Sequence, residues 1–174
     1  IEKASIFLKK AMIINPKHIN IYWNLIALCS NIDDALSLTK KINEIDNKDI
    51  DAITKISGLE AYKGKFEKFN GLLNSSEKNH PNIRSFKWFF SLPKLPKIFF
   101  NRWNFFDYVA KLSVRSRPFY EFGVWNGASF RYLINSFKKG YGFDTFTGLP
   151  ETWYKEPKSN YSNFGAVPKV DRGE

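Results

Sequence analysis

The sequence has few of the features expected of a secreted or membrane-spanning protein. Cys29 is the single cysteine among 174 residues, so no disulfide can form within the chain. No apolar run reaches the length of about 18 residues needed to cross a bilayer, and no signal peptide is visible. These absences favour a reducing compartment, and we expect a cytoplasmic protein in which Cys29 is a small buried side chain.

The sequence also lacks the motifs of several common catalytic and metal sites. It has no Cys or His cluster with zinc-ligand spacing, no Gly-x-Ser-x-Gly elbow and no Gly-Lys-Ser/Thr phosphate loop. Its two histidines, His18 and His80, are expected at surface or capping positions. The acids between positions 44 and 51 are interpreted as a solvated face. No metal ligand and no general base can therefore be assigned.

Positive charge is abundant and uneven. The formal net charge is +10, and the segment 81–118 holds eight basic residues against one acid, Asp107. Lys and Arg interleaved with Phe and Trp can bind single-stranded nucleic acid or an anionic membrane surface. We favour the alternative, in which the aromatic residues form a seam between a helical region and a sheet and the basic residues are solvated. Nucleic acid is therefore not an expected partner.

The first part of the chain has helical periodicity. Apolar positions predict helices over residues 2–14, 19–30 and from Asn31 or Asp33 to Ile45, followed by a pair from near Asp49 to Leu73. Ala4, Ala11 and Pro16 match the small residues and closing proline of a tetratricopeptide repeat, and the region resembles that family although its spacing drifts from about 34 residues. We predict α-helical hairpins over residues 1–74, which could dock a protein partner. A plain helical extension is the alternative.

The middle of the chain is expected to connect two regions. Residues 74–82 are polar and contain a proline, residues 83–90 suggest a short helix, and two prolines break regular structure over 92–96. We assign residues 75–99 to a basic, aromatic linker. A helix from Phe100 or Asn101 to Leu112 should then pack beside the first strand of a domain that covers residues 100–174.

The stretch 118–151 predicts a β-turn-α-β unit. Phe119–Phe122 has the character of a short buried strand, and the turn that follows is bounded by Gly123 and Gly127. A helical pattern at Phe130, Leu133, Ile134 and Phe137 is expected to end at Gly140, and residues 141–143 form a second strand. The predicted class is therefore α/β.

The turn and the acid after the second strand suggest a nucleotide-like ligand. Gly123 and Gly127 have no Cβ to keep a ligand from the backbone, and the next helix would begin with free N–H groups. Asp144 lies 21 positions after Gly123, close to the spacing of about 20 at which an acid binds ribose hydroxyls. The middle glycine of the dinucleotide fingerprint is absent, which disfavours a nicotinamide cofactor.

Two segments carry a resemblance to class I S-adenosylmethionine-dependent methyltransferases, in the branch of the macrocin O-methyltransferases. They are Glu-Phe-Gly-Val-Trp-Asn-Gly-Ala-Ser at 121–129 and Gly-Phe-Asp-Thr-Phe-Thr-Gly-Leu-Pro-Glu at 142–151, together 19 of the 174 residues. The resemblance implies a Rossmann-like sheet larger than the two strands that fit before residue 174. The chain also begins with Ile, so we expect a truncated fragment of a longer protein, inactive alone.

The resemblance implies S-adenosylmethionine as cofactor and a particular set of binding residues. Glu121, Gly123 and Gly127 would line its methionine and ribose part, Asp144 would bind the ribose and Phe146 would flank the adenosine. The full cofactor-binding set is Glu121, Phe122, Gly123, Val124, Trp125, Asn126, Gly127, Ser129, Asp144 and Phe146. A divalent metal, where that branch uses one, is held by carboxylates of later strands, beyond this chain.

The activity implied is O-methylation of a sugar or glycosylated metabolite, a choice that rests on the resemblance alone. The residues after Glu151 have a loop composition with aromatic anchors at Trp153, Tyr154, Tyr161 and Phe164, and such a loop could cover the cofactor site as a lid. The alternative function is a helical-repeat interaction module without catalysis, whose glycine turn is structural.

Overall fold

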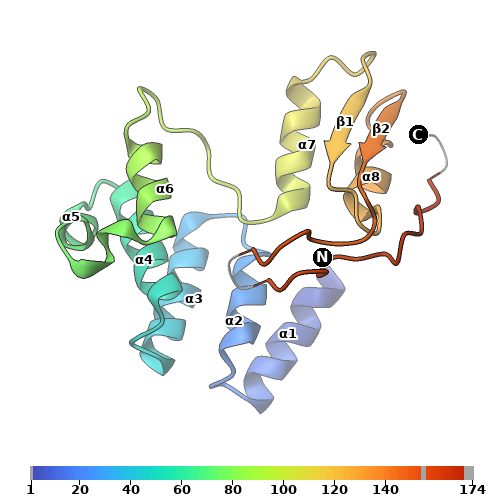
Figure 1. The fold of residues 1–174 in the computed structure, drawn as a ribbon. Coiled ribbons are helices and arrows are strands. Elements are labelled where there is room, and N and C mark those ends of the chain that lie inside the picture. Colours follow the sequence, from blue (N-terminus) through green and yellow to red (C-terminus); the bar gives the residue numbers. More distant parts are fainter. Residues whose placement is uncertain (1, 154–155, 171–174) are drawn as a thin grey trace. The chain divides into compact units, whose positions relative to one another are not determined.

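The computed structural model describes residues 2–153 and 156–170, so Tyr154, one of the expected aromatic anchors, lies outside the described residues. It is mostly helical with one small parallel sheet of two strands, a mixed α/β composition (Figure 1). The chain divides into two compact units, residues 1–102 and 103–174, and each is considered by itself. Within the described residues, no helix is long and apolar enough to cross a membrane.

The first unit is a succession of short helices in which sequence neighbours from α1 to α5 pack on one another. The helices are α1 (Glu2–Ile14), α2 (Ile19–Ile26), α3 (Ile32–Ile45), α4 (Ile50–Tyr62), α5 (Glu67–Leu73), the 3-10 helix η1 (Ser76–Asn79) and α6 (Pro81–Phe90). The expected helices of this region are confirmed, with the differences in their bounds given below.

Polar side chains begin the central helices. The side chain of Asn31 accepts a hydrogen bond of 2.8 Å from the Asp34 N–H at the start of α3. The carboxylate of Asp49 accepts one of 3.0 Å from the Ala52 N–H at the start of α4. Each cap satisfies an N–H that the helix itself cannot, which explains why the chain turns at these two positions.

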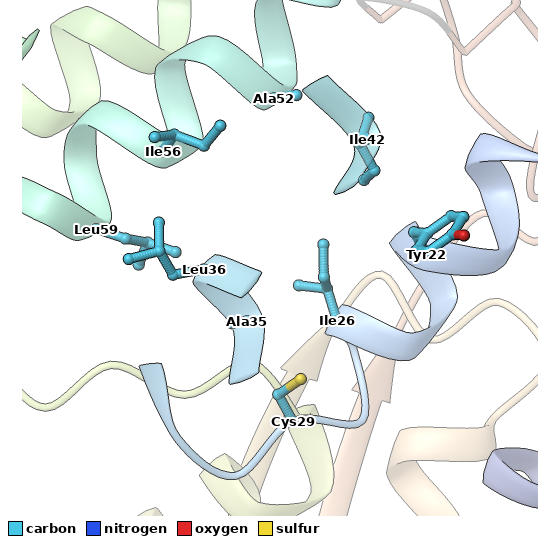
Figure 2. Close-up of a cluster of buried hydrophobic side chains, with 9 residues drawn as sticks. All are labelled: Tyr22, Ile26, Cys29, Ala35, Leu36, Ile42, Ala52, Ile56 and Leu59. Carbon is cyan, nitrogen blue, oxygen red and sulfur yellow. The ribbon is translucent and has the colours of Figure 1, made fainter. Parts of the chain in front are cut away.

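The core of the first unit lies between α2, α3 and α4 (Figure 2). Ala35, Ile42 and Ala52 are fully buried. They pack with a set of apolar side chains from the same three helices and the turn after α2, namely Tyr22, Ile26, Cys29, Leu36, Ile56 and Leu59. Cys29 is thus a buried small side chain, as predicted, and burial raises the pKa of its thiol, with a smaller contribution from Asp34.

Helix α2 is shorter than expected and ends at Ile26. The N–H groups of Leu28 and Cys29 bond to the carbonyls of Leu25 and Ile26, each at 3.0 Å. These are bonds over three residues, which tighten the chain after the helix. Because α2 ends before this turn, Asn31 can take the extended conformation of an N-cap.

Helix α6 lies within the predicted linker and packs against α4 and α5. Gly58 lies inside α4, and a Cβ there would lie 2.2 Å from the Phe86 ring of α6, so the glycine permits a close approach of the two helices. Ile83 is fully buried, and the rings of Phe86 and Phe90 pack on Phe69 of α5. Residues 76–90 therefore belong to the packed body of the first unit.

The second unit contains the predicted β-α-β order. Helix α7 (Arg102–Leu112) is followed by β1 (Phe119–Phe122), α8 (Ala128–Leu133) and β2 (Gly140–Phe143). The strands are parallel, with Phe119 opposite Gly140 and Phe122 opposite Phe143. Both expected strands are confirmed, and β2 begins one residue earlier than predicted.

The predicted extent of the helix between the strands is wrong, because α8 ends at Leu133. The N–H of Ser136 bonds to the Leu133 carbonyl at 2.8 Å, a turn over three residues that ends the α-helical ladder. Gly140 is the first residue of β2 rather than a helix terminator. A Cβ there would lie 2.3 Å from the Phe119 ring, so the glycine makes room for a cross-strand aromatic side chain.

Candidate functional site

The turn after β1 has the backbone conformation that its glycines permit. Gly123 and Gly127 have φ values of 87° and 76°, in the left-handed region that favours glycine. The Gly123 N–H bonds to the Phe143 carbonyl at 2.8 Å and so extends the pairing of the two strands into the turn. A Cβ at Gly123 would meet nothing within 4 Å. The backbone is therefore open to a ligand at this end of the turn.

Asp144 follows β2 and joins the two strand ends. Its Oδ2 accepts a hydrogen bond from the Trp125 N–H and its Oδ1 accepts one from the Phe146 N–H, both at 2.7 Å. Burial opposes ionisation of this carboxyl, but the backbone N–H groups of Trp125, Phe146, Val124 and Thr145 outweigh it and hold its pKa below the ordinary value. A carboxylate that accepts one bond on each oxygen retains lone pairs for a ligand's hydroxyls.

Glu121 and Ser129 meet on the side of the sheet that carries α8. The Ser129 hydroxyl donates a hydrogen bond to Oε1 of Glu121, and both side chains are half-buried. The pair connects the end of β1 to the first turn of α8. A half-buried carboxylate beside the glycine turn can accept a hydrogen bond from, or neutralise, a cationic ligand group.

The remaining predicted residues have different surroundings. Val124 is buried in the core of the second unit with Phe130 and Ile134, so its side chain serves packing. Phe122 is 79% exposed. Asn126 accepts a 3.1 Å bond from the Ala128 N–H through its side chain, which satisfies one N–H at the start of α8.

Trp125 and Phe146 have positive φ values, 50° and 58°, which are unusual for residues with a Cβ. Phe146 is half-buried and packs on the core of the second unit. Its N–H bonds to Asp144 and its carbonyl accepts bonds of 2.9 Å from the N–H groups of Asn163 and Gly165. Asp144 and Phe146 thus connect the glycine turn to a later segment.

This later segment, residues 159–169, is called the return segment because it comes back to the glycine turn. The Ser162 carbonyl accepts a bond of 3.3 Å from the Trp125 indole N–H, and the Tyr161 ring contacts the Trp125 ring edge-on at 5.3 Å between centroids. A Cβ on Gly127 would lie 3.2 Å from Pro168. The return segment therefore covers the Gly127 end of the turn and leaves the Gly123 end exposed.

The structure brings together nine of the ten predicted residues around one turn and one strand end, with Phe122 directed to the exposed face of β1. The sequence predicts a loop here without its individual contacts. The aromatic anchor at Tyr161 and the glycine at Gly165 were the available signals. In the described ranges, no group of three or more His, Cys, Asp or Glu could hold a metal ion.

Helix α7 completes the surroundings of α8. The Tyr132 ring of α8 lies 4.7 Å from the Trp103 ring and its hydroxyl donates a 2.8 Å bond to Asp107 of α7. This hydrogen bond is the first cause of a raised pKa at Tyr132, ahead of burial and the charge of Asp107. The Tyr132 side chain therefore connects α8 to the lead-in helix.

Comparison with family models, with curated proteins and with solved structures returns no match for this chain.

Proposed function

We propose that the chain is part of an S-adenosylmethionine-dependent methyltransferase and that the turn between Gly123 and Gly127, together with Asp144, holds the cofactor. The observation that carries the proposal is the junction at the strand ends. A parallel β1–β2 pair places an ionised carboxylate within hydrogen-bond distance of a left-handed glycine turn. An acid after the second strand of such a unit is suited to bind the two hydroxyls of a ribose.

Two features support a cofactor at the Gly123 end of the turn. There the backbone is open, and the Asp144 carboxylate is held in place by two N–H groups while it retains lone pairs for a diol. Glu121 lies two residues before Gly123 on β1, on the side that would take the amino-acid part of the ligand. When bound, the cofactor would supply an electrophilic methyl group, and the protein would need only to align an acceptor with it.

A sugar hydroxyl, in a glycan or glycosylated metabolite, is the proposed acceptor. This choice is supported only by the resemblance of the two motifs. No general base is assigned among the described residues, and no group of three or more His, Cys, Asp or Glu there could hold a divalent metal. The helical unit would then act as a docking platform for the acceptor or for a protein partner.

The test is calorimetric titration of S-adenosylhomocysteine into the full-length protein, its Asp144→Ala variant and a Glu151→Ala control. Glu151 is an exposed carboxylate of the same unit, so its removal changes the charge equally. We expect saturable binding by the wild type and the control, and binding at least tenfold weaker in Asp144→Ala. Circular dichroism must show that Asp144→Ala is folded, because Asp144 also bonds to the backbone. Absence of binding by folded wild type would refute the proposal.

A second candidate function is a helical interaction module without catalysis. It is favoured by the outer side of α1, where Ile6, Phe7, Ile13 and Ile14 are between 49% and 84% exposed. Exposed apolar side chains at spacings of one and seven residues form one stripe along a helix. A protein that binds no methyl donor but loses a partner when Ile13 and Ile14 are changed to Ser would support this second function.

A further inference from the structure

Trp125 makes three separate contacts that connect both sides of the glycine turn. Its main-chain N–H donates to Asp144, its indole N–H donates to the Ser162 carbonyl, and its ring lies against Tyr161. Trp125 thus bonds to Asp144 through its main chain and to the return segment through its side chain. A movement of Trp125 would therefore break contacts both with Asp144 at the strand end and with the return segment.

The return segment is held in a conformation that depends on such contacts. Ser159, Tyr161 and Phe164 have φ values of 69°, 60° and 53°. Residues with a Cβ adopt this left-handed region only at an energetic cost, so they persist there when neighbouring contacts hold them. The Phe164 side chain itself is 98% exposed and contributes little. Backbone bonds to Leu149 hold the start of the segment, bonds to Phe146 and Trp125 hold its middle, and the Arg131 guanidinium donates to the Lys169 carbonyl at its end.

We propose that Trp125 is a latch that holds the return segment closed over the Gly127 end of the turn, so that release of this latch controls ligand entry. The access part of this inference rests on the proposed function. With the segment closed, Pro168 lies over Gly127 while Gly123 stays open. A ligand that contacts both Gly123 and Gly127 would therefore need an opened return segment.

The latch itself can be tested without any ligand, by amide hydrogen exchange on the full-length chain. The N–H groups of Asn163 and Gly165 both bond to the Phe146 carbonyl, so their exchange reports opening of the return segment. Trp125→Phe retains a ring but removes the indole donor to Ser162. Loss of one such bond should speed exchange at both amides by about fivefold to tenfold.

Trp153→Phe is the matched control. It makes the same Trp-to-Phe change as Trp125→Phe, but at a side chain that is 69% exposed. Exchange at Asn163 and Gly165 should stay within about twofold of the wild type in this variant. Unchanged exchange in Trp125→Phe, or equal acceleration in the control, would overturn the latch.

Ligand entry is tested with Tyr161→Leu, which weakens the latch without changing a residue of the turn. Stopped-flow binding of S-adenosylhomocysteine should show an association rate about threefold to tenfold faster than in the wild type. An unchanged rate, with exchange accelerated, would overturn control of entry. If no variant binds this ligand but exchange responds as expected, the proposed function fails and the latch stands.

Discussion

Ring contacts accompany burial in one aromatic cluster of the first unit and exposure on one face of the sheet in the second. In the first unit, Phe69, Phe86 and Phe90 form contacts between centroids of 5.2 to 6.3 Å, and Phe69 is buried. In the second, Phe122 and Phe143 stack at 5.0 Å on the sheet but are 79% and 48% exposed. Ring contacts alone therefore do not bury a side chain.

The difference follows from how each kind of element covers its neighbours. A helix has one apolar side, which the next helix along the chain can cover, and α2, α3 and α4 do this in turn (Figure 2). A sheet has two faces. In the second unit α8 packs on the face of Phe119, whose ring lies 4.9 Å from that of Phe130, while Tyr120 on the other face is 59% exposed.

The strongest test of this comparison is Phe130→Ala. Phe130 is 1% exposed and packs in the small core of the second unit with Val124 and Ile134. Truncation leaves a cavity under the sheet, and we expect a loss of about 3–5 kcal/mol in the free energy of unfolding of that unit. Denaturant titration followed by amide exchange in β1 and β2 would measure it.

Phe122→Ala is the matched control on the exposed face of β1. Its ring is mostly in water, so the loss should be below about 1 kcal/mol, the size of one cross-strand pair. A loss in Phe122→Ala as large as that in Phe130→Ala would mean that both faces are covered in solution, and the contrast between the two units would fail.

The second prediction concerns the core of the first unit. Ile42 is fully buried between α2, α3 and α4, and Ile42→Ala should cost about 2–5 kcal/mol. The matched control is Ile13→Ala on α1, since Ile13 is 78% exposed. Amide exchange should accelerate in α3 and α4 for the first variant. Equal loss in both variants would show that the outer side of α1 is buried by a partner.

The local elements were predictable from the sequence because their signals are local. Asn31 and Asp49 mark helix starts through their own side chains, and the alternation Phe119–Phe122 marks a strand. The end of α8 was not predictable in this way. Ile134 and Phe137 continue the helical spacing, but Gly140 is required in β2 by the ring of Phe119, a contact across the sheet.

The sequence predicted which residues lie near one another in the site, but not which hydrogen bonds their atoms make. The spacing of Gly123 and Asp144 brought them together at the strand ends, as a parallel pair requires. The bond between Asp144 and the Trp125 N–H depends on a left-handed residue that is not glycine. A backbone conformation of this kind has no sequence signal, and neither does the return of residue 162 to the Trp125 indole.

A smaller effect is expected at the start of α3. Asn31 accepts from the Asp34 N–H, and its own amide donates to the Asp34 carboxylate at 2.8 Å. Asn31→Ala should cost about 1 kcal/mol because one N–H of the first turn loses its partner. Asn47 is exposed in the turn between α3 and α4. Asn47→Ala should therefore lower the free energy of unfolding, measured by denaturant titration, by much less. Similar losses in both variants would contradict a capping role.

The smallest effect is expected from acid titration of Asp144. Its pKa is lowered in the folded protein, so the ionised form stabilises the fold above the ordinary Asp pKa of about 3.9, and this contribution is lost as the pH falls through the lower folded value. Water reaches the half-buried carboxyl, which limits the size of the effect.

Asp144→Asn should remove this part of the pH dependence. The measurement is amide exchange at Trp125 and Phe146, whose N–H groups bond to the carboxylate, compared between about pH 5 and pH 3 after correction for intrinsic rates. Protection in the wild type should fall over this range, and in the variant it should be lower at the start and nearly constant. If protection falls equally in both proteins, the acid sensitivity comes from other carboxyl groups. The Asp144 carboxylate would then not be the group that holds the two strand ends together.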